Sequence, residues 1–240
     1  MRIPFSIALA AVAVSAIAFG QFGKQDGPYQ VGYAANLNVG DSTINLTNDG
    51  NGNPIMTMFA RVGPVAVGSG TSRRPKFRPR TAPGFIGNGP NLCVNTYVFD
   101  PQEEEIGCCS CLVTPNGLDS LSVNSDLISN NLTPAIPASV VIKLLGSTPG
   151  TDPNGNLTLC NPATVNNTNL VYGMMAWGST LEPNGSPGNY GVTNVPFLSG
   201  TLSQGELDAL TDVCTFIQAN GSGFGICKSC RLGALGGAKQ

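Results

Sequence analysis

Eight cysteines constrain this chain of 240 residues more than any other feature, and three of them, Cys108, Cys109 and Cys111, lie within four positions. The chain has no histidine. A structural zinc site takes thiolates in two paired knuckles or thiolates together with histidines, whereas this chain has a single Cys-x-x-Cys. We therefore expect no metal site, and we expect disulfides for the whole set, which is completed by Cys93, Cys160, Cys214, Cys227 and Cys230.

The N-terminal segment predicts export from the cytoplasm. Residues 1–20 combine one basic residue, an apolar run and small residues before two candidate cleavage points, after Ala18 or after Gly20, as in a signal peptide. The run is short for a membrane span of roughly 20 residues, and Pro4 interrupts its start. The expected mature chain, 21–240, is a secreted single domain with no membrane attachment, in a compartment where disulfides persist.

Short alternating stretches separated by glycine, proline and asparagine predict β-strands joined by turns. Six or seven such strands are typical of an antiparallel β-sandwich or a jelly-roll-like domain. We therefore expect a mostly β, disulfide-braced fold. The expected strands are residues 42–47, 55–62, 92–99, 108–113, 139–145 and 170–177.

One α-helix is expected near the C-terminus. Ser203 is followed three positions later by Glu206, which is the capping-box pattern, in which each side chain bonds the backbone N–H of the other residue. Apolar residues then recur at three- and four-residue spacing until Asn220-Gly221, which predicts a helix that ends near Ala219. Cys214 lies in the apolar stripe, so its side chain should point into the core.

Alternation along the strand expected at 108–113 projects Cys108 to one face and Cys109 and Cys111 to the other. These neighbouring thiols should therefore bond to partners in different parts of the chain. Eight cysteines allow about a hundred complete pairings, and the sequence does not select one. We expect a local disulfide from Cys214 to Cys227 or Cys230, because glycines between them let the tail fold back on the helix.

The charge balance predicts no general attraction to nucleic acid, because twelve basic residues stand against fourteen acidic ones. Residues 68–90 nevertheless gather five basic residues among prolines and glycines, and a flexible loop is expected there. The loop either contacts an anionic polymer or acidic partner, or is simply solvated. Its candidate contact residues are Arg73, Arg74, Lys76, Arg78 and Arg80.

Two short segments alternate oxygen-bearing side chains and are candidates for calcium binding. Neither completes an EF-hand loop, because the positions that need glycine and glutamate hold Pro54 and Ala60 in the first and Leu157 and Ala163 in the second. Hairpin turns are the favoured interpretation, and no cofactor is expected. The candidate ligands are Asp49, Asn51, Asn53, Asp152, Asn154 and Asn156.

Few residues indicate catalysis, because the absence of histidine removes the usual Ser/His/Asp and Cys/His arrangements. Residues 103–105 are three glutamates that we expect in a solvated hairpin loop, and Glu182 and Asp208 lie far apart in the sequence. Trp177, which can stack on a sugar, ends an apolar strand where a core position is favoured.

These features predict a secreted, non-catalytic structural or interaction domain of the cell exterior. Its partner would be an extracellular molecule or a second copy of the same chain, with no nucleic acid and no membrane involved. The alternative is a carbohydrate-binding module or a carbohydrate-active hydrolase on a β-sandwich. Paired carboxylates and exposed aromatic side chains would favour this alternative, and exposed edge strands would favour the first function.

Overall fold

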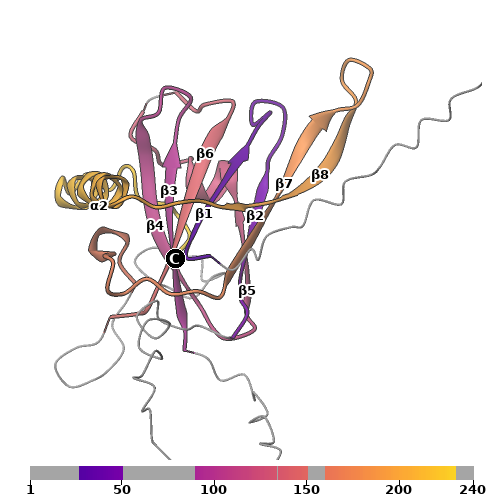
Figure 1. The fold of residues 1–240 in the computed structure, drawn as a ribbon. Coiled ribbons are helices and arrows are strands. Elements are labelled where there is room, and N and C mark those ends of the chain that lie inside the picture. The colour runs from indigo at the N-terminus through magenta and orange to yellow at the C-terminus, as the bar shows by residue number, and fades with distance from the viewer. Residues whose placement is uncertain (1–26, 51–89, 134, 151–159, 231–240) are drawn as a thin grey trace, which may run out of the picture.

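A computed structural model describes residues 27–50, 90–133, 135–150 and 160–230 (Figure 1). Several sequence-based expectations fall outside these ranges. They concern the signal peptide at 1–20, the strand at 55–62, the basic loop with Arg73 to Arg80, and the calcium candidates Asn51, Asn53, Asp152, Asn154 and Asn156.

The described strands form two antiparallel sheets (Figure 1). Sheet A has the order β4-β3-β6-β1-β9, with β4 at Glu105–Val113, β3 at Leu92–Phe99, β6 at Val140–Ser147, β1 at Tyr29–Ala34 and β9 at Leu198–Ser199. Sheet B has the order β5-β2-β7-β8, with β5 at Leu118–Ser122, β2 at Thr43–Asn48, β7 at Met174–Pro183 and β8 at Tyr190–Pro196. The predicted mostly β, antiparallel sandwich is confirmed.

The two sheets share one core because alternate side chains of each sheet turn toward the other. Ile44 and Leu46 of β2 are fully buried and belong to the same apolar cluster as Ile142 and Leu144 of β6. Phe197, between β8 and β9, belongs to this cluster where the chain passes from sheet B to sheet A. The sandwich therefore has a single continuous interior.

Four strand predictions agree with the structure to within a few residues, namely those at 42–47, 92–99, 108–113 and 139–145. The strand predicted at 170–177 starts too early. Gly173 has a φ of 104°, which glycine adopts readily, and Leu170 makes only an isolated bridge with Ser147. The regular strand β7 therefore begins at Met174.

Helix α2, at Gln204–Ala219, covers the face of sheet A that points away from sheet B, and it forms a third layer (Figure 1). Its predicted bounds are confirmed. Ser203 caps it as predicted, since its Oγ accepts a hydrogen bond from the backbone N–H of Glu206 at 3.1 Å. The Glu206 carboxylate does not act as the capping box predicts, because it accepts hydrogen bonds from Tyr29 and Lys143 of sheet A.

All eight cysteines form disulfides, as predicted. Cys108 lies in the cluster between sheet A and α2, whereas Cys109 and Cys111 lie in the core on the other side of the strand, so the predicted alternation is confirmed. The four bonds are Cys93–Cys160, Cys108–Cys214, Cys109–Cys227 and Cys111–Cys230.

The expected local disulfide from Cys214 to the C-terminal tail is wrong. Cys214 points from α2 toward sheet A and meets Cys108, with 5.9 Å between the two Cα atoms. The tail instead runs along the outer edge of β4, where the N–H groups of Cys108 and Ser110 donate to the carbonyls of Gly225 and Cys230. The tail therefore meets the cysteines of β4 that face away from the helix.

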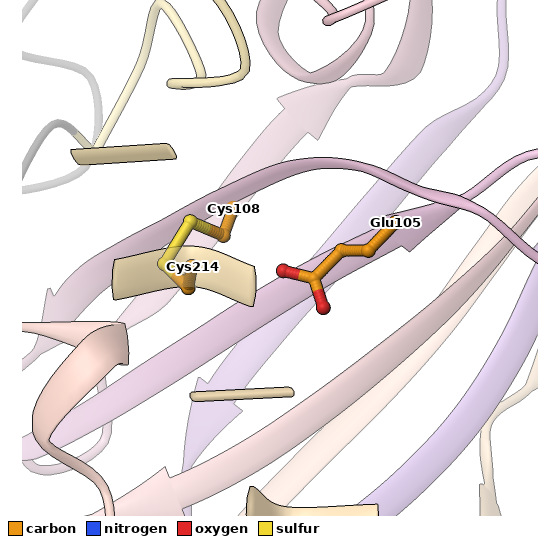
Figure 2. Close-up of side chains that lie close together, drawn as sticks. All are labelled: Glu105, Cys108 and Cys214. Carbon is orange, nitrogen blue, oxygen red and sulfur yellow. A yellow bond between two sulfur atoms is a disulfide. The ribbon is translucent and has the colours of Figure 1, made fainter. Parts of the chain in front are cut away.

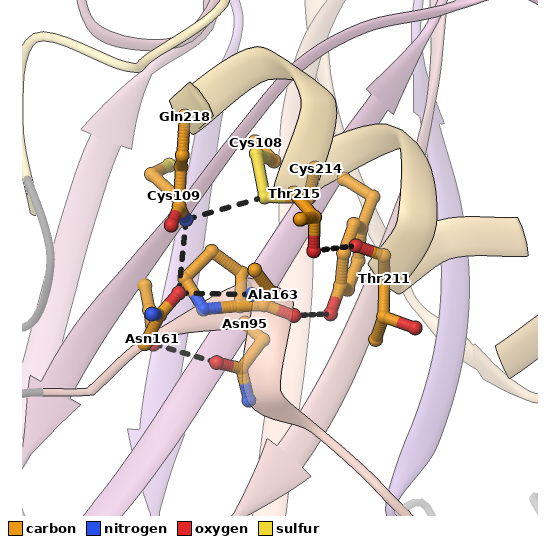
Figure 3. Close-up of a disulfide and its surroundings, with 12 residues drawn as sticks. Asn95, Cys108, Cys109, Asn161, Ala163, Thr211, Cys214, Thr215 and Gln218 are labelled. Atoms are coloured by element: carbon orange, nitrogen blue, oxygen red, sulfur yellow. Dashed lines mark hydrogen bonds between the residues drawn. A yellow bond between two sulfur atoms is a disulfide. The ribbon is translucent and has the colours of Figure 1, made fainter. Parts of the chain in front are cut away.

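The C-terminal end of α2 is held by a side-chain hydrogen bond beside the Cys108–Cys214 disulfide (Figure 3). Gln218 donates from Nε2 to Oδ1 of Asn161 at 2.9 Å. The same oxygen accepts from the N–H of Ala163 and caps the short helix η2 at Pro162–Thr164. A second short helical segment, η1, spans Val123–Leu127. Among the described helices, none has the length and apolar character that a bilayer crossing requires.

Candidate functional site

A β-bulge in strand β4 decides which side chains lie beneath helix α2. Cys108 pairs with Tyr97, and both face the helix. Regular alternation would turn Ile106 toward the helix as well and Glu105 toward sheet B. The register shifts just before Phe99, so Ile106 lies in the core between the sheets and Glu105 lies opposite Phe99 on the helix side. The bulge thus places a carboxyl group under α2.

The bulge borders a pocket of about 320 Å³ between α2 and sheet A, here called the α2 pocket. A neighbouring hollow of about 300 Å³ shares Phe99, Glu103 and Lys143 with it. In the described part of the chain, the lining of the α2 pocket has five charged or ionisable side chains, Glu103, Glu104, Glu105, Lys143 and Glu206, and four apolar ones, Phe99, Ala209, Leu210 and Val213.

Glu105 is the most unusual residue of the α2 pocket. It is 8% exposed, and neither carboxyl oxygen has a hydrogen-bond partner among the described residues. Its carboxyl lies beside the Cys108–Cys214 disulfide, with a carboxyl oxygen and both sulfurs within 4.8 Å of one another (Figure 2). Burial raises the pKa of Glu105 to about 9, although the charge of Lys143 acts to lower it. The carboxyl is therefore uncharged at neutral pH.

The expectation of a solvated acidic loop is consequently wrong for Glu105, while Glu103 and Glu104 are exposed as predicted. The sequence carried no signal for this difference. The three glutamates are consecutive, and only the bulged pairing of β4 with β3 separates Glu105 from the other two.

Unlike the carboxyl of Glu105, the carboxylate of Glu206 accepts two hydrogen bonds. The hydroxyl of Tyr29 donates to Oε1 at 2.5 Å, and Nζ of Lys143 donates to the same oxygen at 2.9 Å. Burial acts to raise the pKa of Glu206, but the bonds from Tyr29 and Lys143 outweigh it, and the pKa is lowered. Nζ of Lys143 also lies 4.4 Å from the centroid of the Phe99 ring. The α2 pocket thus holds one paired carboxylate and one unpaired, neutral carboxyl.

The donor sets in the described residues do not fit a metal ion. Two groups of acidic and cysteine side chains lie close together, one around Glu105 with Cys108 and Cys214, the other around Asp119 with Cys111 and Cys230. Each contains both sulfurs of a disulfide, which are not the thiolates that zinc requires.

Two further acidic residues, Asp119 and Asp49, contact residues that are far from them in the sequence. Burial raises the pKa of Asp119, whose Oδ2 lies 3.1 Å from Sγ of Cys230. Asp49, the calcium candidate that the structure describes, follows β2, where its N–H donates to the carbonyl of Gly173 at 2.9 Å.

Trp177 lies on the outer face of sheet B, so the prediction of a core position is wrong. In β7, Met174 and Ala176 are buried, and Met175 and Trp177 alternate with them on the solvent side. Trp177 is half-buried and pairs across the sheet with Asn45, whose Oδ1 accepts a hydrogen bond from Ser120 at 2.7 Å. An aromatic ring and fixed polar groups therefore share this face.

Strand β8 is an edge of sheet B that carries no charged residue. Val192 is 72% exposed there, and Tyr190 is also exposed. The β7–β8 hairpin reaches beyond the neighbouring strands (Figure 1). Proteins usually block such edges with charges, bulges, prolines or covering segments, and β8 has a regular register with β7 and a proline only at its end.

The other sheet edges in the described part of the chain are protected. Residues 225–230 cover the edge of β4, and β9 is only two residues long. On β5, Asp119 is a buried acidic residue within the edge strand, which is a common device against edge-to-edge pairing. Among the described sheet edges, β8 is therefore the one that lacks such protection.

Glu182 and Asp208 are not brought together, since one is in β7 of sheet B and the other on α2, where Gln204 donates to it at 2.6 Å. No protein-family model matches this sequence, and comparison with curated proteins and with solved structures finds no significant relative. The features that indicate a function are the α2 pocket, the outer face of sheet B and the edge strand β8.

Proposed function

We propose that this protein is a secreted, non-catalytic interaction domain that associates with a second copy of itself through strand β8. The observation that carries the proposal is the uncharged, exposed edge of β8, in which Val192 is 72% exposed. Four disulfides and the signal-peptide pattern of residues 1–20 support an extracellular location.

A second copy is the partner that best suits this edge. Two identical strands can pair antiparallel about a two-fold axis, and such an interface needs no charge complementarity. Alternation places Tyr190 and Val192 on one face of β8, so apolar side chains of the two copies would become neighbours across the pair. Sheet B would then continue from one copy into the other.

The test is the oligomeric state of the mature protein, measured by sedimentation equilibrium over a range of concentrations. A dimer that forms with rising concentration is expected, and Val192→Lys should abolish it, because lysines on two paired edges repel each other. Leu118→Lys is the matched control, because Leu118 is a similarly exposed apolar residue, at 62%, on the opposite edge strand β5. A monomer at every concentration, or a dimer unaffected by Val192→Lys, would contradict the proposal.

The position of Trp177 favours a second candidate, a carbohydrate-binding module that uses the outer face of sheet B. The ring would stack on a sugar while Asn45 and Ser120 bond its hydroxyl groups. Trp177 is the single tryptophan of the chain, so its fluorescence reports on this face alone. Quenching by soluble oligosaccharides that Asn45→Ala weakens would favour this function, and unchanged emission throughout a glycan series would count against it.

A further inference from the structure

We propose that the α2 pocket binds the charged end of an aliphatic amine, with Glu105 as its counter-ion and the apolar side chains of α2 against its methylene chain. The pocket lies on the helix side of sheet A, away from strand β8. This proposal is therefore independent of the proposed self-association, and either can fail without the other.

The buried carboxyl of Glu105 needs a binding partner. Buried polar groups nearly always have hydrogen-bond partners, and an exception needs an explanation. Both oxygens of Glu105 lack a partner among the described residues, and the residue is only 8% exposed where it lines the pocket. A ligand with N–H donors would supply the missing bonds.

The charge of the pocket lining favours a cation. Among the described residues of the lining, Lys143 is the single basic one, and its Nζ is already bonded to Glu206 at 2.9 Å. Glu103 and Glu104 are exposed at the same pocket. The remaining charge of these described residues is negative, so they attract a cation and repel an anion.

The walls of the pocket combine apolar side chains with carboxyl groups. Ala209, Leu210 and Val213 of α2 and the Phe99 ring line the pocket beside the carboxyl groups. A volume of about 320 Å³ suits a short alkyl chain with one cationic end. A metal ion is a poor match, because its donors would include disulfide sulfurs rather than thiolates.

Binding must release a proton from the protein. Glu105 is protonated in the empty pocket, because burial raises its pKa to about 9, and a protonated amine pairs with it only when that proton leaves to the buffer. The titratable groups that line the pocket with Glu105 are Glu103 and Glu104 from the β3–β4 turn, Lys143 from β6 and Glu206 from α2. The buried Tyr97 of β3 interacts electrostatically with Glu105, and its hydroxyl donates to the carbonyl of Pro162. Glu105 is the one among them that is buried without a partner, so affinity should rise as the pH approaches about 9.

The experiment is calorimetric titration of the mature protein with two probes, cadaverine and Nα-acetyl-lysine methylamide. The neutral diol of the same length as cadaverine is the ligand control. Binding of either amine, with a heat that changes with the ionisation enthalpy of the buffer, is expected. Cadaverine binding alone would indicate a free polyamine, whereas binding of the lysine derivative would indicate a lysine side chain of a partner protein.

Glu105→Gln keeps the shape of the side chain and removes its charge, so affinity should fall roughly tenfold or more and proton release should disappear. Glu182→Gln, a carboxyl on sheet B outside the pocket, should leave both unchanged. Circular dichroism and a thiol assay establish that each variant is folded and oxidised. Absence of binding by both amines, equal binding of the diol, or undiminished binding by Glu105→Gln would overturn the proposal.

Discussion

Cys108 and Cys109 are neighbours in the sequence, yet their side chains leave strand β4 on opposite faces and bond to different layers of the molecule. Cys108 joins sheet A to Cys214 of helix α2, and Cys109 joins it to Cys227 of the C-terminal tail. With Cys111 bonded to Cys230, strand β4 is covalently linked both to the helix above it and to the tail along its edge.

Removing either neighbouring disulfide should lower the free energy of unfolding by a similar amount. The two bonds span 106 and 118 residues, so they restrict the unfolded chain to a similar extent. We expect the double variants C108A/C214A and C109A/C227A to lose about 2–5 kcal/mol each in urea unfolding. Peptide mapping without reduction should show Cys108 linked to Cys214, and a bond from Cys108 to Cys109 would refute the strand geometry.

Glu105→Gln should stabilise the protein at neutral pH, and increasingly so at higher pH. The pKa of Glu105 is raised in the folded state to about 9, so its contribution to stability is complete below the unfolded pKa of about 4.3 and is lost as the pH rises toward the folded value. The variant should gain on the order of 4 kcal/mol at about pH 7, which is about 2.7 pH units above the unfolded pKa, since one pKa unit is worth about 1.4 kcal/mol.

Urea unfolding of both proteins at a series of pH values measures this gain. The chain has no histidine, so no imidazole titration overlaps the window. A difference between Glu105→Gln and the unaltered protein that stays constant from acid to alkaline pH would show that Glu105 ionises normally.

Tyr29→Phe should destabilise the protein by about 1–2 kcal/mol, because it removes a hydrogen bond to a charged acceptor. The pKa of Glu206 is lowered in the folded state, so the stability from this bond is present above the unfolded pKa and is lost as the pH falls through the folded one. The cost of the substitution should therefore shrink in acid. Tyr190→Phe on the exposed strand β8 is the control and should change little.

Ser203→Ala should cost about 1 kcal/mol in thermal or urea unfolding, because the first turn of α2 loses the side-chain acceptor for the N–H of Glu206. Ser203→Asp keeps an acceptor at the same position and should retain most of the stability. An equal loss of stability in both variants would mean that the hydrogen-bond acceptor at position 203 does not stabilise the helix.

Gly32→Ala should destabilise the sandwich by about 1–3 kcal/mol. A Cβ at Gly32 would lie 2.6 Å from atoms of the Phe197 ring, which is 1% exposed, so the buried ring would have to shift. Gly191→Ala in β8 is the matched control, since nothing lies within 4 Å of its Cβ position. Thermal unfolding distinguishes the two, and an unaffected Gly32→Ala variant would show that the core adjusts around Phe197.

The features that the sequence by itself determined are those set by near neighbours in the chain. The opposite directions of Cys108 and Cys109 follow from strand alternation, and the start of α2 follows from the serine at 203. The mostly β fold follows from the repeated alternation between turn residues. Trp177 shows the limit of this reasoning, because apolar neighbours did not reveal which face of β7 it occupies.

Tertiary structure alone decided which residues meet. Tyr29 and Glu206 are 177 positions apart and come together because β1 lies in the sheet that α2 covers. Cys214 bonds to Cys108 rather than to a nearby cysteine because the helix face and the strand face oppose each other. Glu105 is buried beneath α2 because a bulge reverses the alternation of β4 at that point. Strand order, register and bulges depend on the packing of the whole chain, which local sequence patterns do not encode.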